Sequence, residues 1–140
     1  MAKLTSFVYC INAERVPALD GKGEGINAMG VVSALMPEFV PGTFSFSVIF
    51  SILDVDIAKE NKIRIIFKDN KNAHMIDTGD LALPANSDDS VLKLPSEHRG
   101  LNLSMDFRNV VFEENGEYCT EIYFNDSLLS SNPIYVQGRR

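Results

Sequence analysis

The chain has 140 residues, of which 45% are hydrophobic, and it carries a formal charge of -6 with a pI near 4.8. This length and its nine phenylalanines suit one domain over residues 1–140 with a buried core, which excludes wholesale disorder. The negative charge argues against nucleic-acid phosphates or an anionic membrane as a partner.

The first segment bears on where the protein works. Asn12–Arg15 interrupts the apolar residues well short of a secretion signal, and no stretch approaches the ~18 apolar residues of a membrane span. We therefore expect a cytoplasmic protein. In that compartment Cys10 and Cys119 are expected to stay reduced, each as a small buried hydrophobic residue within a strand.

The N-terminal third contains one predicted strand and one segment whose secondary structure the sequence does not decide. Leu4–Ile11 is rich in β-branched and aromatic residues, which predicts a strand that ends near Pro17. Gly21–Gly25 lacks the Gly-Lys-Ser/Thr ending of a phosphate loop and the spacing of a dinucleotide fingerprint, so it predicts a flexible hairpin connection. The spacing of apolar residues in Ile26–Leu35 fits both a helix and a strand, so the period does not decide between them.

The clearest strand follows two prolines that end regular structure between Met36 and Gly42. Large apolar residues alternate with serines along this strand, which places the two kinds of side chain on opposite faces. We therefore expect Phe46 and Phe50 in the core, together with Phe44, Val48 and Ile52, and the serines Ser45, Ser47 and Ser51 outside.

The middle of the chain predicts short strands separated by turns. Asp54–Lys62 is charged and turn-like, with room for a single helical turn, and Ile63–Phe67 reads as a strand. Asp69-Asn70 begins a turn, because these side chains bond to their own backbone. Ala73–Leu83 predicts a weak strand around Gly79, and Val91–Leu94 predicts a short one.

The last forty residues have the alternation of antiparallel hairpins. Phe107–Phe112, Tyr118–Phe124 and Ile134–Val136 read as strands, with turns at Asn115-Gly116 and Asn125-Asp126. Taken with the earlier segments, this pattern predicts an all-β chain forming a single antiparallel β-sandwich of about 7–9 strands.

The segment around Tyr118 resembles a corner of the immunoglobulin-like sandwiches. There a tyrosine follows the turn glycine, here Gly116, and packs inward. The resemblance implies a disulfide cysteine two positions after the tyrosine, where this chain has Thr120; Cys119 instead points to the opposite face. The likeness therefore implies an immunoglobulin-like or C2-like sandwich at the level of fold only.

Over its whole length the chain is similar to an uncharacterised bacterial family of small stand-alone sandwich proteins. That resemblance implies a strand for Ile26–Leu35 and implies no activity. The resembling segments are Gly21-Lys22 with Ile26–Gly30, Phe44–Val48, Ile63–Ile65 with Lys68-Asp69, Leu101–Leu103, Gly116–Tyr118, Asn125-Asp126 and Pro133–Val136.

The sequence gives little support for a metal site or a catalytic site. Asp69, Asp88 and Asp89 are weak candidates for Ca²⁺, which needs 6–8 converging oxygen ligands. His74 and His98 lack the local spacing of a zinc site and are expected to be solvated. The acidic residues of one hairpin are expected to face water, and these are Glu113, Glu114, Glu117 and Glu121.

These observations predict a non-enzymatic protein without a cofactor. Its expected partner is another protein or a second copy of the chain, bound through an unpaired edge strand or the loops at one end. Apolar residues facing outward would mark that surface, among them Leu128-Leu129, Tyr123 and Tyr135. The alternative is a Ca²⁺- or small-ligand-binding module that uses the Asp-rich loops.

Overall fold

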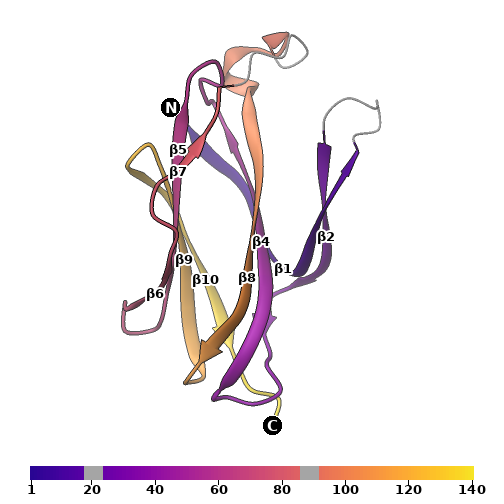
Figure 1. The fold of residues 1–140 in the computed structure, drawn as a ribbon, viewed down its shortest axis with the longest axis vertical. Coiled ribbons are helices and arrows are strands. Elements are labelled where there is room, and N and C mark those ends of the chain that lie inside the picture. Colours follow the sequence, from indigo (N-terminus) through magenta and orange to yellow (C-terminus); the bar gives the residue numbers. More distant parts are fainter. Residues whose placement is uncertain (18–23, 86–91) are drawn as a thin grey trace. The chain divides into compact units, whose positions relative to one another are not determined.

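The structure is a computed structural model that describes residues 1–17, 24–85 and 92–140 (Figure 1). It is built almost wholly of strands, with one short 3-10 helix, η1 (Ser96–His98). In chain order the strands are β1 (Lys3–Pro17), β2 (Glu24–Val32), β3 (Ala34–Leu35), β4 (Gly42–Leu53), β5 (Asn61–Lys68), β6 (His74–Asp77), β7 (Leu81–Leu83), β8 (Gly100–Phe112), β9 (Gly116–Phe124) and β10 (Ser127–Val136).

The strands form two sheets, which confirms the predicted all-β sandwich class. One sheet has the order β2-β1-β4-β8, and the other has the order β3-β10-β9-β5-β6, with β7 also paired to β5. The β1–β2, β5–β6, β5–β7 and β5–β9 pairs are antiparallel, whereas β3 runs parallel to β10. Ile26–Leu35, which the period left open, lies in β2 and β3 as the family resemblance implied, with a bend at Ser33 between them and a φ of +72° at Gly30.

The chain divides into two compact units, each assembled from separate segments. The first unit comprises Met1–Thr5, Ile52–Leu101 and Glu117–Pro133, and the second comprises Ser6–Ser51, Asn102–Gly116 and Ile134–Arg140. Neither unit is a continuous stretch, so each depends on strand pairing between distant parts of the sequence.

The core of the second unit is built on alternate residues of β4. Phe46, Val48 and Phe50 are fully buried. The Phe46 ring lies 5.1 Å from that of Phe107 and 6.3 Å from that of Phe112, in tilted arrangements. Strand periodicity therefore puts the phenylalanines inside, as the sequence predicts, although Phe44 is only half-buried.

The core of the first unit is built on β5 and β9. Along β9 every second residue is buried, beginning at Tyr118 and including Thr120 and Ile122. The Tyr118 ring stacks on Phe67 of β5 at 5.9 Å. Cys119 lies on the opposite face and is only half-buried, so the expectation that it would be a buried hydrophobic residue is wrong.

Turn residues adopt the conformations that their types favour. Asn125 and Asp126 both have positive φ, 47° and 71°, and form the two-residue loop between β9 and β10. This is the pattern of a type I′ hairpin turn, where Asn and Asp tolerate the left-handed region. At Asp69, Oδ1 accepts the N–H groups of Lys71 at 2.8 Å and Ala73 at 2.9 Å, which confirms the predicted turn.

One serine of β4 contradicts the simple alternation. Ser47 was expected outside but is fully buried, and its hydroxyl donates to Oδ1 of Asp106 at 2.6 Å. β4 lies between β1 and β8 in its sheet, so neighbouring strands cover this small residue from both sides. A polar residue tolerates that position because it has a hydrogen-bond partner.

Two predicted strands differ from the structure. The weak strand at Ala73–Leu83 is split into β6 and β7 by Gly79, whose φ of +66° takes it out of the extended region. Leu92–Leu94 is not extended, and Val91 lies outside the described residues. The Arg99 side chain donates to the carbonyls of Leu92 at 2.8 Å and Leu94 at 3.0 Å, so these carbonyls have a partner other than a strand.

Candidate functional site

The first candidate site is the unpaired side of β2 in the second unit, which we call the β2 edge. β2 is the terminal strand of its sheet and pairs with β1 alone, and no described strand lies along its other side (Figure 1). Its register with β1 extends from Tyr9 opposite Val32 to Pro17 opposite Glu24. The β2 edge thus presents a row of backbone donors and acceptors that can accept another strand.

The composition of the β2 edge is unusual for an exposed strand. No residue from Gly25 to Val32 is charged, and none of them is buried. Large apolar side chains are exposed here, with Met29 at 49% and Val31 at 62%, and Ile11 of β1 at 44%. Natural edge strands are usually protected by charged side chains, especially Lys, or by Pro. Gly25–Val32 contains no charged residue and no proline.

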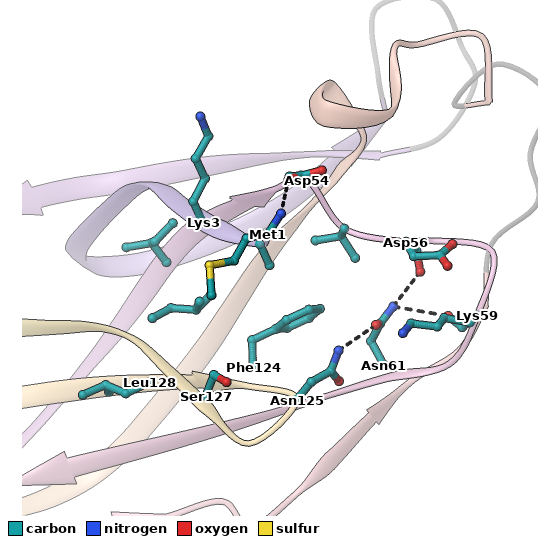
Figure 2. A pocket seen from close by; sticks show the side chains of 14 residues that line it. Met1, Lys3, Asp54, Asp56, Lys59, Asn61, Phe124, Asn125, Ser127 and Leu128 are labelled. Atoms are coloured by element: carbon teal, nitrogen blue, oxygen red, sulfur yellow. Dashed lines mark hydrogen bonds and ion pairs between the residues drawn. The ribbon is translucent and has the colours of Figure 1, made fainter.

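The second candidate site is a pocket in the first unit, with a volume of about 570 Å³ (Figure 2). Its lining comes from the start of β1, the Asp54–Glu60 loop, the end of β9 and the start of β10. The buried side chains of Val55 and Phe124 contribute apolar surface, and Asp54, Asp56 and Lys59 contribute charge. This volume lies within the range of about 300–1,000 Å³ typical of small-molecule sites.

Two amides hold one wall of this pocket in place (Figure 2). Asn61 Nδ2 donates to the backbone carbonyls of Asp56 at 3.0 Å and Lys59 at 3.2 Å. Asn125 Nδ2 donates to Asn61 Oδ1 at 3.0 Å, and Asn125 Oδ1 accepts the N–H of Lys62 at 2.9 Å. These amides bind the Asp54–Glu60 loop to the β9–β10 turn, so their role is structural.

The outward-facing side of β5 and β9 in the first unit carries ion pairs. Lys68 Nζ lies 2.8 Å from Glu121 Oε1, with the two side chains only 19% and 12% exposed. Tyr123 donates its hydroxyl to Glu121 at 3.3 Å. Glu113, Glu114 and Glu117 are exposed as expected, but the expectation that Glu121 would be solvated is wrong, because Lys68 and Tyr123 cover it.

The pKa shifts at these pairs have electrostatic causes. The hydrogen bond to Glu121 raises the pKa of Lys68, and the bond to Asp126 at 2.9 Å raises that of Lys62. Arg64, which binds Asp77 through two nitrogens, holds the pKa of that carboxyl well below its usual range. In each case the shift favours the charged form, so these groups stay charged near neutral pH and are poorly suited to act as an acid or a base.

Of the three proposed metal candidates, only Asp69 lies in the described part of the chain. Asp69 uses Oδ1 in its own turn, and Asp88 and Asp89 lie outside the described residues. Residues 1–17, 24–85 and 92–140 contain no group of three or more His, Cys, Asp and Glu that could hold a metal ion.

The histidines and cysteines have separate surroundings. His74 is exposed, with Nδ1 3.8 Å from Asp77 Oδ2, and His98 is exposed in η1. Cys10 is fully buried, and burial raises the pKa of its thiol, which disfavours a nucleophilic thiolate. Cys119 Sγ lies 2.8 Å from the hydroxyl oxygen of Ser131. Both cysteines are free thiols.

Some of the residues expected to mark a surface are exposed. Leu128 and Tyr135 are each about half exposed, whereas Leu129 and Tyr123 are partly covered. Sequence reasoning missed the β2 edge, although the absence of charge from Gly25 to Leu35 was a visible signal. It also missed the Asn61–Asn125 contact, which only the β5–β9 pairing creates. No helix among the described residues has the length and apolar character needed to cross a membrane.

Comparison with known proteins gives a family and distant structural likenesses. A family model described as "Family of unknown function (DUF6941)" matches residues 11–137. No curated protein sequence matches the chain. An immunoglobulin-like protein from Pseudomonas aeruginosa is similar in structure, with 9% identity and a TM-score of 0.44 over 98% of this chain and 97% of that one.

A second likeness is to a larger enzyme. The chain is similar to part of a beta-glucosidase from Listeria innocua, with 12% identity and a TM-score of 0.46 over 95% of this chain. It spans 16% of the length of that enzyme. Likenesses at this level carry no argument about activity.

Proposed function

The chain belongs to the Family of unknown function (DUF6941), and we propose that it is a non-enzymatic module that binds polypeptide by adding a strand to the β2 edge. The observation that carries this proposal is a terminal strand that has no charged residue from Gly25 to Val32, has Met29 and Val31 exposed, and has no described strand on its outer side. Strand addition supplies affinity through main-chain hydrogen bonds and specificity through alternate side chains. The proposal includes a cytoplasmic setting, which the two free thiols favour.

Site-specific photo-crosslinking tests this proposal. A photoreactive residue at Val31 should crosslink to a polypeptide in a lysate of the producing cells, whereas the same residue at Thr43 should not. Thr43 is a matched control, because it is an exposed strand residue of the same unit. Equal crosslinking from both positions, or none from Val31, would contradict strand addition at the β2 edge.

A second candidate function, binding of a small molecule with an apolar body, is favoured by the pocket in the first unit. Its volume of about 570 Å³ and the apolar surface from Val55 and Phe124 suit such a ligand, with Asp54 and Lys59 placed to orient polar groups. The test is a thermal-shift screen on the wild type and on Ser127→Tyr, which places a larger side chain at a lining position of the pocket. Compounds that raise the melting temperature of the wild type alone support the site, because a ligand that binds the folded state stabilises it. Equal shifts in both proteins count against it.

A further inference from the structure

We propose that the strand added at the β2 edge comes from a second copy of this chain. In this arrangement two β2 strands pair antiparallel about a two-fold axis that passes through Ala28. The inference rests on the proposed function and names the partner that the β2 edge takes. Three properties of β1 and β2 lead to it: the lack of burial, the order of large and small residues, and the distribution of charge.

The outer part of the β1–β2 pair contributes little to a core. Ile11–Pro17 of β1 pairs with the first residues of β2, yet none of the described side chains in these two stretches is buried. β1 pairs with β4 on its other side, so β2 is the strand of this pair that has a single neighbour in the sheet. A second β2 strand would supply the missing neighbour and cover part of Met29 and Val31.

The sequence of β2 is complementary to itself when read in the opposite direction. Ala28 is the central residue of the nine in Glu24–Val32, so a two-fold axis at Ala28 pairs the whole strand with its copy. In this register Gly25 faces Val31, and Ile26 faces Gly30. Each glycine therefore lies opposite a β-branched side chain, while Asn27 faces Met29 and Glu24 faces Val32.

The charge of the chain favours the same surface. Each copy carries a formal charge of -6, so two copies repel each other at long range. The stretch Gly25–Val32 has no charge and therefore brings no like charges into direct contact. It also offers no electrostatic attraction to an acidic or a basic peptide, so the segment that pairs with it should be uncharged, and Gly25–Val32 of a second copy meets that requirement.

The resulting assembly would remove the exposed end of one sheet. The four strands β2-β1-β4-β8 of each copy would join through the two β2 strands into one continuous sheet. Such a two-fold contact is isologous and closed, so it ends at a dimer and does not propagate into a fibre. A closed pair thus protects an edge that would otherwise invite aggregation.

Charge substitutions at the two-fold axis test the proposal through the mass in solution. We expect the wild type to have a mass of about 31 kDa, twice the 15.5 kDa of one chain, by light scattering or sedimentation. Ala28→Lys and Ala28→Glu should each be monomeric, because like charges then lie opposite each other, whereas their equimolar mixture should return to the dimer mass. Thr43→Lys should remain dimeric. Circular dichroism confirms that each variant is folded.

A disulfide test examines the register. Opposed residues of an antiparallel pair have Cα atoms roughly 4.5–5.5 Å apart, within the range that a disulfide spans. In a Cys119→Ser background, Ala28→Cys should form a covalent dimer with oxidised glutathione as the oxidant. Val31→Cys should do so much less, because Val31 faces Gly25 of the other copy. Equal yields, or no product from Ala28→Cys, would overturn the proposed axis.

Salt dependence separates this inference from the broader proposal. Added salt screens the repulsion between two acidic copies, so the dimer fraction should rise with ionic strength. A wild type that stays monomeric at every salt concentration, while Val31 still crosslinks to other polypeptides, overturns the second-copy inference and leaves strand addition in place. Monomer without any crosslink from Val31 overturns both.

Discussion

Replacing Phe46 tests whether alternate residues of β4 form the core of the second unit. Its side chain is fully buried, and its ring contacts those of Tyr9 at 6.1 Å, Phe107 at 5.1 Å and Phe112 at 6.3 Å. A buried aromatic removes 150–250 Å² from water, which at about 25 cal/mol per Å² is worth about 4–6 kcal/mol. Phe46→Ala keeps only the Cβ, so we expect the free energy of unfolding to fall by about 3–5 kcal/mol.

Urea unfolding followed by circular dichroism measures this loss. Because domains of this size are stable by about 5–15 kcal/mol, the variant should still fold, but with a much lower midpoint. The matched control is Phe39→Ala, since Phe39 is 56% exposed and its removal should change stability by at most about 0.5 kcal/mol. A loss below about 1.5 kcal/mol for Phe46→Ala, or equal losses for both variants, would refute the proposed core.

Three further predictions use the same unfolding assay. Ser47→Ala should cost about 1 kcal/mol, because Asp106 loses a hydrogen bond from a buried hydroxyl, and an unchanged midpoint would count against that bond. Arg64 lowers the pKa of Asp77, so the pair stabilises the fold above pH about 4 and loses this effect as the pH falls through the lowered pKa. The stability gap between wild type and Asp77→Asn should therefore be largest near neutral pH and close in acid, and a gap that does not depend on pH would contradict the pairing. Gly100→Ala would place a Cβ 2.1 Å from a backbone carbonyl oxygen of β4, and we expect a loss of at least about 2 kcal/mol; full stability would show that the two strands are not so close.

Local patterns predicted the strands and hairpins well. The alternation from Phe46 onward and the Asn125-Asp126 turn depend only on residues that are close together in the sequence. Both can therefore be recognised from the sequence alone. Some strand lengths were underestimated, as in β10, which begins at Ser127 although the sequence predicted a strand only over Ile134–Val136. A hydrogen-bonded partner such as β9 extends a strand beyond the residues that favour it by composition.

The candidate site could not be predicted in the same way, because it depends on strand order. Which strand ends a sheet is set by pairing between distant segments, so the absence of charge in Gly25–Leu35 did not by itself show that β2 is a terminal strand. The burial of Ser47 between two neighbouring strands has the same origin. The partial burial of Glu121 also depends on the β5–β9 register, which places Lys68 within reach.

Amide hydrogen exchange along β2 tests the central claim most directly. If the β2 edge pairs with a second strand, the backbone N–H groups that point away from β1 should be protected in concentrated wild-type protein. The same groups should exchange rapidly in Ala28→Lys, while the groups bonded to β1 keep their protection in both proteins. Equal and rapid exchange of the outward N–H groups in wild type and variant would contradict the account.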